Sequence, residues 1–435
     1  MLRALPRRRE ASPHPSVASR RYISGVSPHP VIPAVVTALN LNGLGVVRCL
    51  GRHGVRVIGV HGGEKGPELR SRYLDEIWEQ RPGQDLAEVL LEHAPSLAGV
   101  RPVVMAITDD SVESIARAHD RLVAHYRVPM GDAANAARLL SKEGVDAAAR
   151  THRMPVPATR TCGDEASLRL ALRELRPPFI LKPQEKSEAY ARSGAKKAFR
   201  LDSADEVLAA YATFSGLEPR VVVQEFIPGT DADVWFCLVA IGGDGRTLGS
   251  FVGHKIRQWP PHCGGTASCE PIEEQGDLAR ITGDFFRGER LCGLGSIEFK
   301  RDPRDGRFYM IEPTVCRTDW QSAVADDNGV PIPFLVWCDA TDTPLPRVRR
   351  KWLRRRWVHL NSDRRSADYY RSRGELGLFS WMWSIRPLMR PAYWAVDDPA
   401  PGLAIVGDFL RRGFRKVGRK IGLVSSTADA SDPAR

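Results

Sequence analysis

Residues 294–321, LGSIEFKRDPRDGRFYMIEPTVCRTDWQ, decide the fold because they predict two neighbouring strands that each carry a glutamate. Apolar residues alternate with polar ones in 296–299 and cluster in 308–311, and turn-forming residues (DPRDG) stand between them. Glu298 and Glu312 are fourteen positions apart, so the folded hairpin brings both carboxylates to the same end of a sheet. Two carboxylates facing one hard cation are typical of a Mg²⁺ site. For an isolated hairpin, the alternative is a pair of solvated surface glutamates.

Three upstream segments add groups that suit a nucleotide. Residues 179–183 (FILKP) predict a short strand with a phosphate-binding lysine, Lys182, near its end. Residues 221–229 (VVVQEFIPG) predict a buried strand that stops at Pro-Gly and leaves backbone groups free to contact adenine. Lys255 and Arg257 fall on one face of a strand by the period of two. Each feature alone is usually a solvated surface, so the evidence is their order along the chain.

In this order the motifs resemble the ATP-grasp superfamily, and within it the carboxylate-amine ligases that include D-aspartate ligases. The similarity covers most of residues 30–345 and is strongest over 178–331. It implies an enzyme that uses ATP and Mg²⁺, with Mn²⁺ as a substitute, to phosphorylate the carboxylate of an amino acid. An amine would then attack the acyl phosphate, with release of ADP and phosphate. The expected partners are therefore a small carboxylate and a small amine.

The resemblance also implies roles for single residues. The residues that would hold the ATP phosphates, adenine and ribose are Lys142, Lys182, Gln224, Glu225, Phe226, Ile227 and Asp231. The basic residues that would meet the transferred phosphate and the substrate carboxylate are Lys255 and Arg257. The metal ligands would be Glu298 and Glu312, with Thr314 where most family members have an asparagine.

Arg317 follows the second glutamate on the same loop, and its guanidinium offers two parallel donors to a substrate carboxylate. A salt bridge to Asp319 or Asp326 is the alternative. Thr314 is a weaker magnesium ligand than asparagine, which keeps open a weakened ATP-binding sensor or scaffold, unless Asp319 or water substitutes. Residues 185–197 and 260–268 are the candidate lids that would protect an acyl phosphate from water.

The N-terminal part predicts a strand, a glycine loop, a helix and a second strand, which is a Rossmann-like unit. Gly43 and Gly45 suggest a dinucleotide site, but Arg48 replaces the third glycine and His61 follows the second strand in place of an acid. A nicotinamide-dependent oxidoreductase is therefore the weakest of the three functional hypotheses. The expected fold class is α/β, with a Rossmann-like domain, an ATP-grasp domain of two α+β subdomains, and a basic Trp-rich C-terminal extension.

The expected domain boundaries follow composition along the 435 residues. They are a disordered basic tail, the Rossmann-like domain, the ATP-grasp domain, the Trp-rich extension and a second disordered tail, at 1–29, 30–136, 137–345, 346–424 and 425–435. The N-terminal tail is rich in arginine and could also be a transit segment or an overextended start.

Composition also bears on location and partners. Eight scattered cysteines without paired spacing indicate neither zinc nor disulfides, and with no apolar span they favour the cytoplasm. The net charge of +11 concentrates in basic runs such as 347–356 and 411–420, where tryptophans are interleaved nearby. Such a surface suits an anionic membrane, whereas nucleic acid competes less well and a helix packed on the ligase core is the plain alternative. A homodimer is compatible with these features.

Overall fold

The computed structural model describes residues 32–63, 66–97, 99–184, 199–262, 264–273, 277–348, 354–385 and 389–420, without the side chains of 214 and 411–420. The predicted tails at 1–29 and 425–435 and the candidate lid at 185–197 lie outside these residues. The domain boundaries inferred from the sequence remain predictions.

The N-terminal sheet has four parallel strands in the order β3-β2-β1-β4. They are β1 (Ala34–Val36), β2 (Val57–His61), β3 (Glu76–Glu79) and β4 (Val103–Met105). Helix α1 (Leu41–Arg52) follows β1, and the side chain of Asn40 accepts a hydrogen bond from the Gly43 backbone N–H at its start. All residues of β1 and β4 are buried, as expected of parallel strands covered on both faces. The Rossmann-like unit predicted from the sequence is confirmed.

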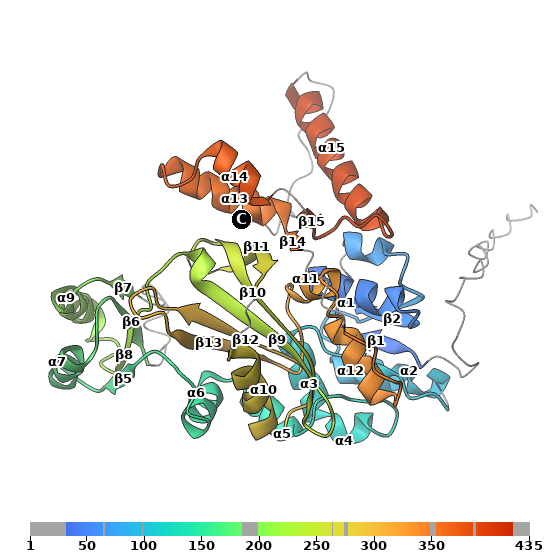
Figure 1. The fold of residues 1–435 in the computed structure, drawn as a ribbon, viewed down its shortest axis with the longest axis horizontal. Helices are drawn as coiled ribbons and strands as arrows, with labels where there is room; N and C mark the ends of the chain where they lie inside the picture. The colour runs from blue at the N-terminus through green and yellow to red at the C-terminus, as the bar shows by residue number, and fades with distance from the viewer. Residues whose placement is uncertain are drawn as a thin grey trace, which may run out of the picture. The chain divides into compact units, whose positions relative to one another are not determined.

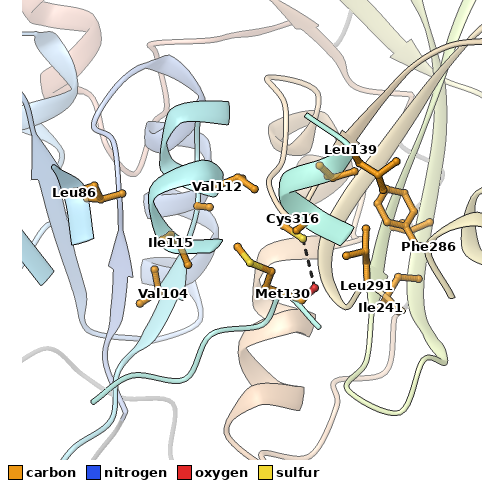
Figure 2. Packing of buried hydrophobic residues seen from close by; sticks show 14 of the residues in the cluster. Leu86, Val104, Val112, Ile115, Met130, Leu139, Ile241, Phe286, Leu291 and Cys316 are labelled. Carbon is orange, nitrogen blue, oxygen red and sulfur yellow. Dashed lines mark hydrogen bonds between the residues drawn. The ribbon is translucent and has the colours of Figure 1, made fainter. Parts of the chain in front are cut away.

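Helices surround this sheet and lead to the next one. They are α2 (Leu86–His93), α3 (Asp109–Arg117), α4 (His119–Leu122), α5 (Ala133–Arg138) and α6 (Lys142–Thr151), with short 3-10 turns η1 (Pro67–Arg70) and η2 (Ala94–Leu97). Leu86, Val104 and Ile115 from this region share one apolar cluster with Phe286 and Leu291 of the large sheet's layer. Figure 2 shows Met130 and Cys316 between the two groups, where the Cys316 thiol donates to the Met130 carbonyl at 3.5 Å.

A small antiparallel sheet follows, in the order β5-β8-β6-β7. Its strands are β5 (Thr159–Cys162), β6 (Phe179–Pro183), β7 (Phe199–Leu201) and β8 (Val221–Glu225). Helices α7 (Glu165–Glu174) and α9 (Ala204–Phe214) pack against it around a separate apolar cluster. In β6 and β8, buried residues alternate with half-buried ones. One face of the small sheet therefore packs on its helices, and the other face is only partly covered.

The large sheet has seven strands in the order β13-β12-β9-β10-β11-β14-β15. Its first five are β9 (Val234–Ile241), β10 (Thr247–Trp259), β11 (Gly265–Pro271), β12 (Gly293–Arg301) and β13 (Phe308–Val315). Helices α10 (Leu278–Gly288) and α12 (Ile332–Ala340) pack on it, and α11 (Ser322–Asp327) contacts α1 (Figure 1). The hairpin predicted from residues 294–321 is confirmed as the antiparallel pair β12 and β13.

The Trp-rich C-terminal segment supplies the remaining strands of this sheet. Strand β14 (Arg356–Val358) pairs antiparallel with β11, and β15 (Met389–Pro391) pairs parallel with β14. Helix α13 (Leu360–Ser372) packs on β10 and β11, and α14 (Leu378–Ile385) follows it (Figure 1). Helix α15 (Ala400–Lys420) contacts η1. The sheet therefore continues past residue 345, where the sequence predicts a domain boundary.

Within the described residues, no helix is both long enough and apolar enough to span a bilayer.

Candidate active site

A cavity of about 510 Å³ opens between the small and large sheets. Residues 224–227 and Ile180 of the small sheet's side line it, opposite Glu298 of β12 and Glu312 of β13. Nine of the thirteen site residues predicted from the sequence line this cavity: Gln224, Glu225, Phe226, Ile227, Lys255, Glu298, Glu312, Thr314 and Arg317. Residues from seven strands or strand ends thus meet at one place.

Glu298 and Glu312 lie directly opposite each other in the β12–β13 ladder. Glu298 accepts hydrogen bonds from Lys255 Nζ at 2.8 Å and from Gln321 Nε2 at 3.2 Å. No hydrogen bond to the Glu312 carboxylate is found among the described residues. Desolvation in the cavity, followed by the negative charges of Glu298 and Asp319, raises the pKa of Glu312 above its usual value. An unpaired carboxylate beside a second one fits a bound divalent cation.

Two lysines supply positive charge on the same wall. Lys255 of β10 is almost fully buried and divides its hydrogen bonds between Glu298 and the Gln258 side chain. Lys300 lies two residues after Glu298 on β12 and donates to the Thr230 carbonyl at 2.6 Å. Burial, and to a lesser extent the charge of Lys255, lowers the pKa of Lys300. Both cations could balance the charge of a triphosphate.

The loop after β13 adds an arginine and an aspartate. Arg317 donates to Asp109 at 2.6 Å and to Asp319 at 2.9 Å, and these acids outweigh the effect of burial and raise the pKa of Arg317. The other oxygen of Asp319 accepts hydrogen bonds from Thr314 Oγ1 at 2.9 Å and Ser296 Oγ at 3.0 Å. The salt bridge to Asp319 that the sequence left as an alternative therefore forms. A carboxylate also stands beside Thr314, where the family pattern has an amide.

The strand end at 224–227 forms the opposite wall. The backbone N–H groups of Glu225 and Phe226 donate to Ala158 and Pro178 carbonyls, and the Glu225 carboxylate binds Arg176. These groups are therefore already bonded, contrary to the expectation that the strand end leaves its backbone amides free. The N–H of Ile227 has no acceptor among the described residues, which leaves it available to a ligand.

Lys182 and Lys142 lie next to this wall but do not line the cavity. Ile180 and Lys182 alternate onto the same half-buried face of β6, and Ile180 does line the cavity. Burial, with the like charge of Lys142, lowers the pKa of Lys182, so the two lysines lie close together. Lys142 is exposed at the first turn of α6, where Ser141 caps the helix.

The structure does not bring Arg257 and Asp231 into the cavity lining. Arg257 is buried and donates to Asp363 and Ser384 of the C-terminal helices, each at 2.8 Å. Register shifts in β10 on both sides of Arg257 interrupt the period of two, so Lys255 and Arg257 reach different partners. Asp231, expected at the ribose, accepts from the backbone N–H groups of Gln258 and His262 and from the Gln258 side chain. Both residues hold the cavity wall in place.

The single site residues predicted from the sequence leave out Lys300, Gln258, Trp320 and Gln321 of the lining, whereas His262 and Thr266 fall within the candidate lid at 260–268. Lys300 could have been found because it follows Glu298 by two positions on the same strand. The His262 backbone has a positive φ of 67°, and its ring contacts Tyr369 and Tyr370 of α13. No local pattern indicates such a loop contact.

Comparisons with known proteins bear on the fold and on overall sequence similarity. No family model matches the chain. The chain is 24% identical over 246 residues to D-aspartate ligase of Enterococcus faecium (strain Aus0004), a match that spans 53% of this chain and 58% of that ligase.

Three solved structures share the fold. An ADP complex of N5-carboxyaminoimidazole ribonucleotide synthetase has a TM-score of 0.54 at 16% identity and covers 74% of this chain and 80% of its own. Phosphoribosylglycinamide synthetase of Anaerococcus prevotii has a TM-score of 0.54 at 14% identity, with coverages of 72% and 76%. The biotin carboxylase domain of Hydrogenobacter thermophilus 2-oxoglutarate carboxylase, solved with MgADP and bicarbonate, has a TM-score of 0.54 at 13% identity, with coverages of 74% and 72%. The chain therefore has the ATP-grasp fold predicted from its sequence, and it resembles D-aspartate ligase in sequence.

Proposed function

We propose that this protein is an ATP-dependent carboxylate-amine ligase. The observation that carries the proposal is the opposed pair Glu298 and Glu312, with Lys255 bonded to Glu298, in a cavity whose other wall is the strand end at 224–227. Acids and lysines at one end of a cavity and an apolar strand end at the other suit a magnesium-bound triphosphate with its base. The ADP complexes of the structural neighbours support the same ligand class.

The reaction would proceed in two steps. A carboxylate oxygen of the first substrate attacks the γ-phosphorus of ATP, the bond to the β-phosphate oxygen breaks, and ADP leaves. The nitrogen of an amine then attacks the acyl carbon, phosphate leaves with the bonding electrons, and the nitrogen loses a proton. Phosphoryl transfer depends mainly on positioning and charge neutralisation, which are the contributions that this cavity can make.

The side chains of the cavity have separate roles in this proposal. Lys255 and Lys300 balance the charge of the phosphates. Lys182 and Lys142 add positive charge from the side of the small sheet. Arg317, fixed by Asp109 and Asp319, presents its remaining donor to the substrate carboxylate. Glu298 and Glu312 would hold Mg²⁺, whose charge would stabilise the transferring phosphoryl group. The name of the D-aspartate ligase relative makes aspartate the first carboxylate to test.

A weakened ATP-binding sensor is the alternative that Thr314 suggests. The contact between Thr314 and Asp319 favours the enzyme, because a third carboxylate lines the cavity and its charge acts on Glu312. Oxygen ligands from Asp319 or an ordered water could complete a magnesium site as an asparagine would.

The test is Mg²⁺-dependent ADP formation by the full chain with a panel of D- and L-amino acids, each with and without an added amine. We expect one carboxylate to stimulate ADP release, and Glu312→Ala to reduce that release at least a hundredfold. Glu79→Ala, which removes an exposed carboxylate on β3, is the matched control and should keep full activity. ATP binding without ADP release under any pair would favour the sensor.

We also propose a peripheral contact between the C-terminal helices and an anionic membrane. Phe379 and Trp383 of α14 are 85% and 74% exposed, and Phe409 of α15 is 72% exposed just before the basic run 411–420. Apolar side chains beside Lys and Arg suit a headgroup surface. Flotation with anionic liposomes should recover the full chain and lose the chain that lacks residues 405–435; equal recovery of both would refute the role of α15.

A further inference from the structure

A second cavity, of about 520 Å³, lies apart from the proposed active site. Its walls come from α1, α11, β14 and the segment 389–397, and its lining shares no residue with the first cavity. Helix α11 separates the two: it begins after Gln321, which donates to Glu298, and it ends at Asp327 in the second cavity.

Two arginines of this lining build the wall. Arg48 donates to Asp398 at 2.9 Å and to the Ala392 carbonyl at 2.8 Å, which fastens the turn after β15 to α1. Arg52 binds the carboxylates of Asp397 at 2.8 Å and Asp326 at 2.9 Å. Their charges are therefore satisfied within the protein and are not offered to a ligand.

Three further charged groups of the lining lack such partners. Neither Arg355 nor Arg390 has a carboxylate at ion-pair distance anywhere in the described part of the chain. The Arg355 side chain donates to the Asp327 backbone carbonyl at 3.0 Å, and the Arg355 backbone N–H donates to Asn328 Oδ1 at 3.1 Å. The Asp327 side chain is 17% exposed, and its closest cation is Arg52 at 3.9 Å. Burial, with the charge of Asp326, raises the pKa of Asp327 to about 6 and outweighs the opposing charges of Arg52, Arg390 and Arg355.

The rest of the lining is apolar. Trp357 is buried in β14, Trp394 is 43% exposed, and Pro391 and Val396 lie on the same segment of the wall. The cavity thus offers two guanidinium groups, one carboxylate and an apolar surface to the same small molecule.

We propose that this second cavity binds a free α-amino acid with an apolar side chain. Arg355 and Arg390 would take the carboxylate of the ligand, because guanidinium donors match the geometry of carboxylate oxygens. Asp327 would take the ammonium group, and the tryptophans would cover the side chain. A ligand with only a negative charge suits the cavity poorly, since Asp326, Asp327 and Asp397 also line it. The inference stands independently of the proposed ligase activity, because no residue of the first cavity takes part.

Isothermal titration of the full chain with the D and L forms of leucine, phenylalanine and tryptophan tests this assignment. Two analogues separate the charges: the N-acetyl amino acid lacks the ammonium group, and the methyl ester lacks the carboxylate. We expect the best free amino acid to bind with micromolar to millimolar affinity, and each analogue to bind at least tenfold more weakly. Binding of the N-acetyl form as tight as that of the free form would overturn the zwitterion assignment.

Substitutions in each cavity test whether the amino acid binds in the second one. Arg390→Gln and Asp327→Asn should each weaken binding at least tenfold, whereas Glu312→Ala in the first cavity should bind as the unmodified chain does. Thermal melts of both variants confirm that they fold. If no amino acid binds, or if binding is unchanged in Arg390→Gln and Asp327→Asn and lost in Glu312→Ala, the second site does not exist as proposed.

Discussion

At the scale of single residues, Glu298 and Glu312 occupy matched positions on paired strands but have different partners. Glu298 is bonded to Lys255 and Gln321, whereas the Glu312 carboxylate faces the charges of Glu298 and Asp319. In the folded protein without metal, the Glu298 carboxylate is therefore stabilised by its partners, whereas the charged Glu312 carboxylate is destabilised. Such unfavourable charge is common at functional sites and has a measurable cost in stability.

Replacing each glutamate with glutamine in EDTA should change stability in opposite directions. Glu312→Gln should raise the free energy of unfolding at pH 7 by about 0.5 kcal/mol, because it removes an unpaired negative charge. Glu298→Gln should lower it by about 2 kcal/mol, because it leaves the buried Lys255 ammonium without a charged acceptor. Chemical denaturation followed by circular dichroism measures both values.

The pH dependence of the Glu312→Gln effect has a defined sign. The pKa of Glu312 is raised in the folded state, so the carboxylate costs stability above that pKa and costs nothing once it is protonated in both states. The gain from Glu312→Gln should therefore be largest at neutral pH and vanish below the usual glutamate pKa of about 4.3. A gain that grows as the pH falls would contradict this account.

The sequence predicts that the two acids meet on paired strands, but it does not predict their exact register. The pairing that runs from the turn through Phe299 and Met310 shifts by one residue, and this shift brings Glu298 opposite Glu312. The sequence also does not predict that Glu298 is the acid with bonded partners among the described residues, since Lys255 and Gln321 come from distant positions. Asp231 shows the same limit: a polar residue near the site looks like a ligand contact until its three bonds to Gln258 and His262 are seen.

At the scale of secondary structure elements, β10 explains why Arg257 differs from Lys255. Alternation along a regular strand would give both the same face, but the two register shifts turn Arg257 toward α13. Nothing in the local sequence signals the irregularity, and the partner of Arg257, Asp363, lies more than a hundred residues away. Periodicity therefore predicts the strand and the place of Lys255 correctly. It places Arg257 on the cavity face, where the structure does not have it.

The same strand links the C-terminal helices to the proposed active site. Asp363 of α13 is fully buried and accepts from Arg257, from Ser268 Oγ at 2.5 Å and from Trp381 Nε1 at 2.7 Å. Tyr370 of the same helix touches His262, which lines the cavity. Helix α13 thus supports the loop at 260–262 from behind, although the sequence predicts it within a separate extension.

At the scale of the whole molecule, the fold class follows from the sequence because glycine loops, strand patterns and the acidic hairpin each report local geometry. The place of the C-terminal segment does not follow, because β14 and β15 are only three residues long, and β14 pairs with the distant strand β11 while β15 pairs with β14. Basic charge and tryptophan content describe its surface and miss its buried residues Trp357, Val358 and Asp363.

Truncation should separate the parts of this segment that complete the fold from the part that does not. A chain ending at residue 345 loses β14, which covers the edge of β11, and loses Asp363, so the buried Arg257 keeps its charge without an acid. Breaking a buried ion pair from one side costs about 3–5 kcal/mol, a large part of the stability of most domains. We expect this chain to lack a cooperative thermal transition. A chain ending at residue 404 keeps β14, β15 and α13, and the described side chains that it removes, at 405–410, are mainly exposed, so it should melt within a few degrees of the full chain. Differential scanning calorimetry of the full chain and the two truncated chains measures these transitions. A cooperative melt of the chain ending at 345 would show that the ATP-grasp core folds without its last two strands.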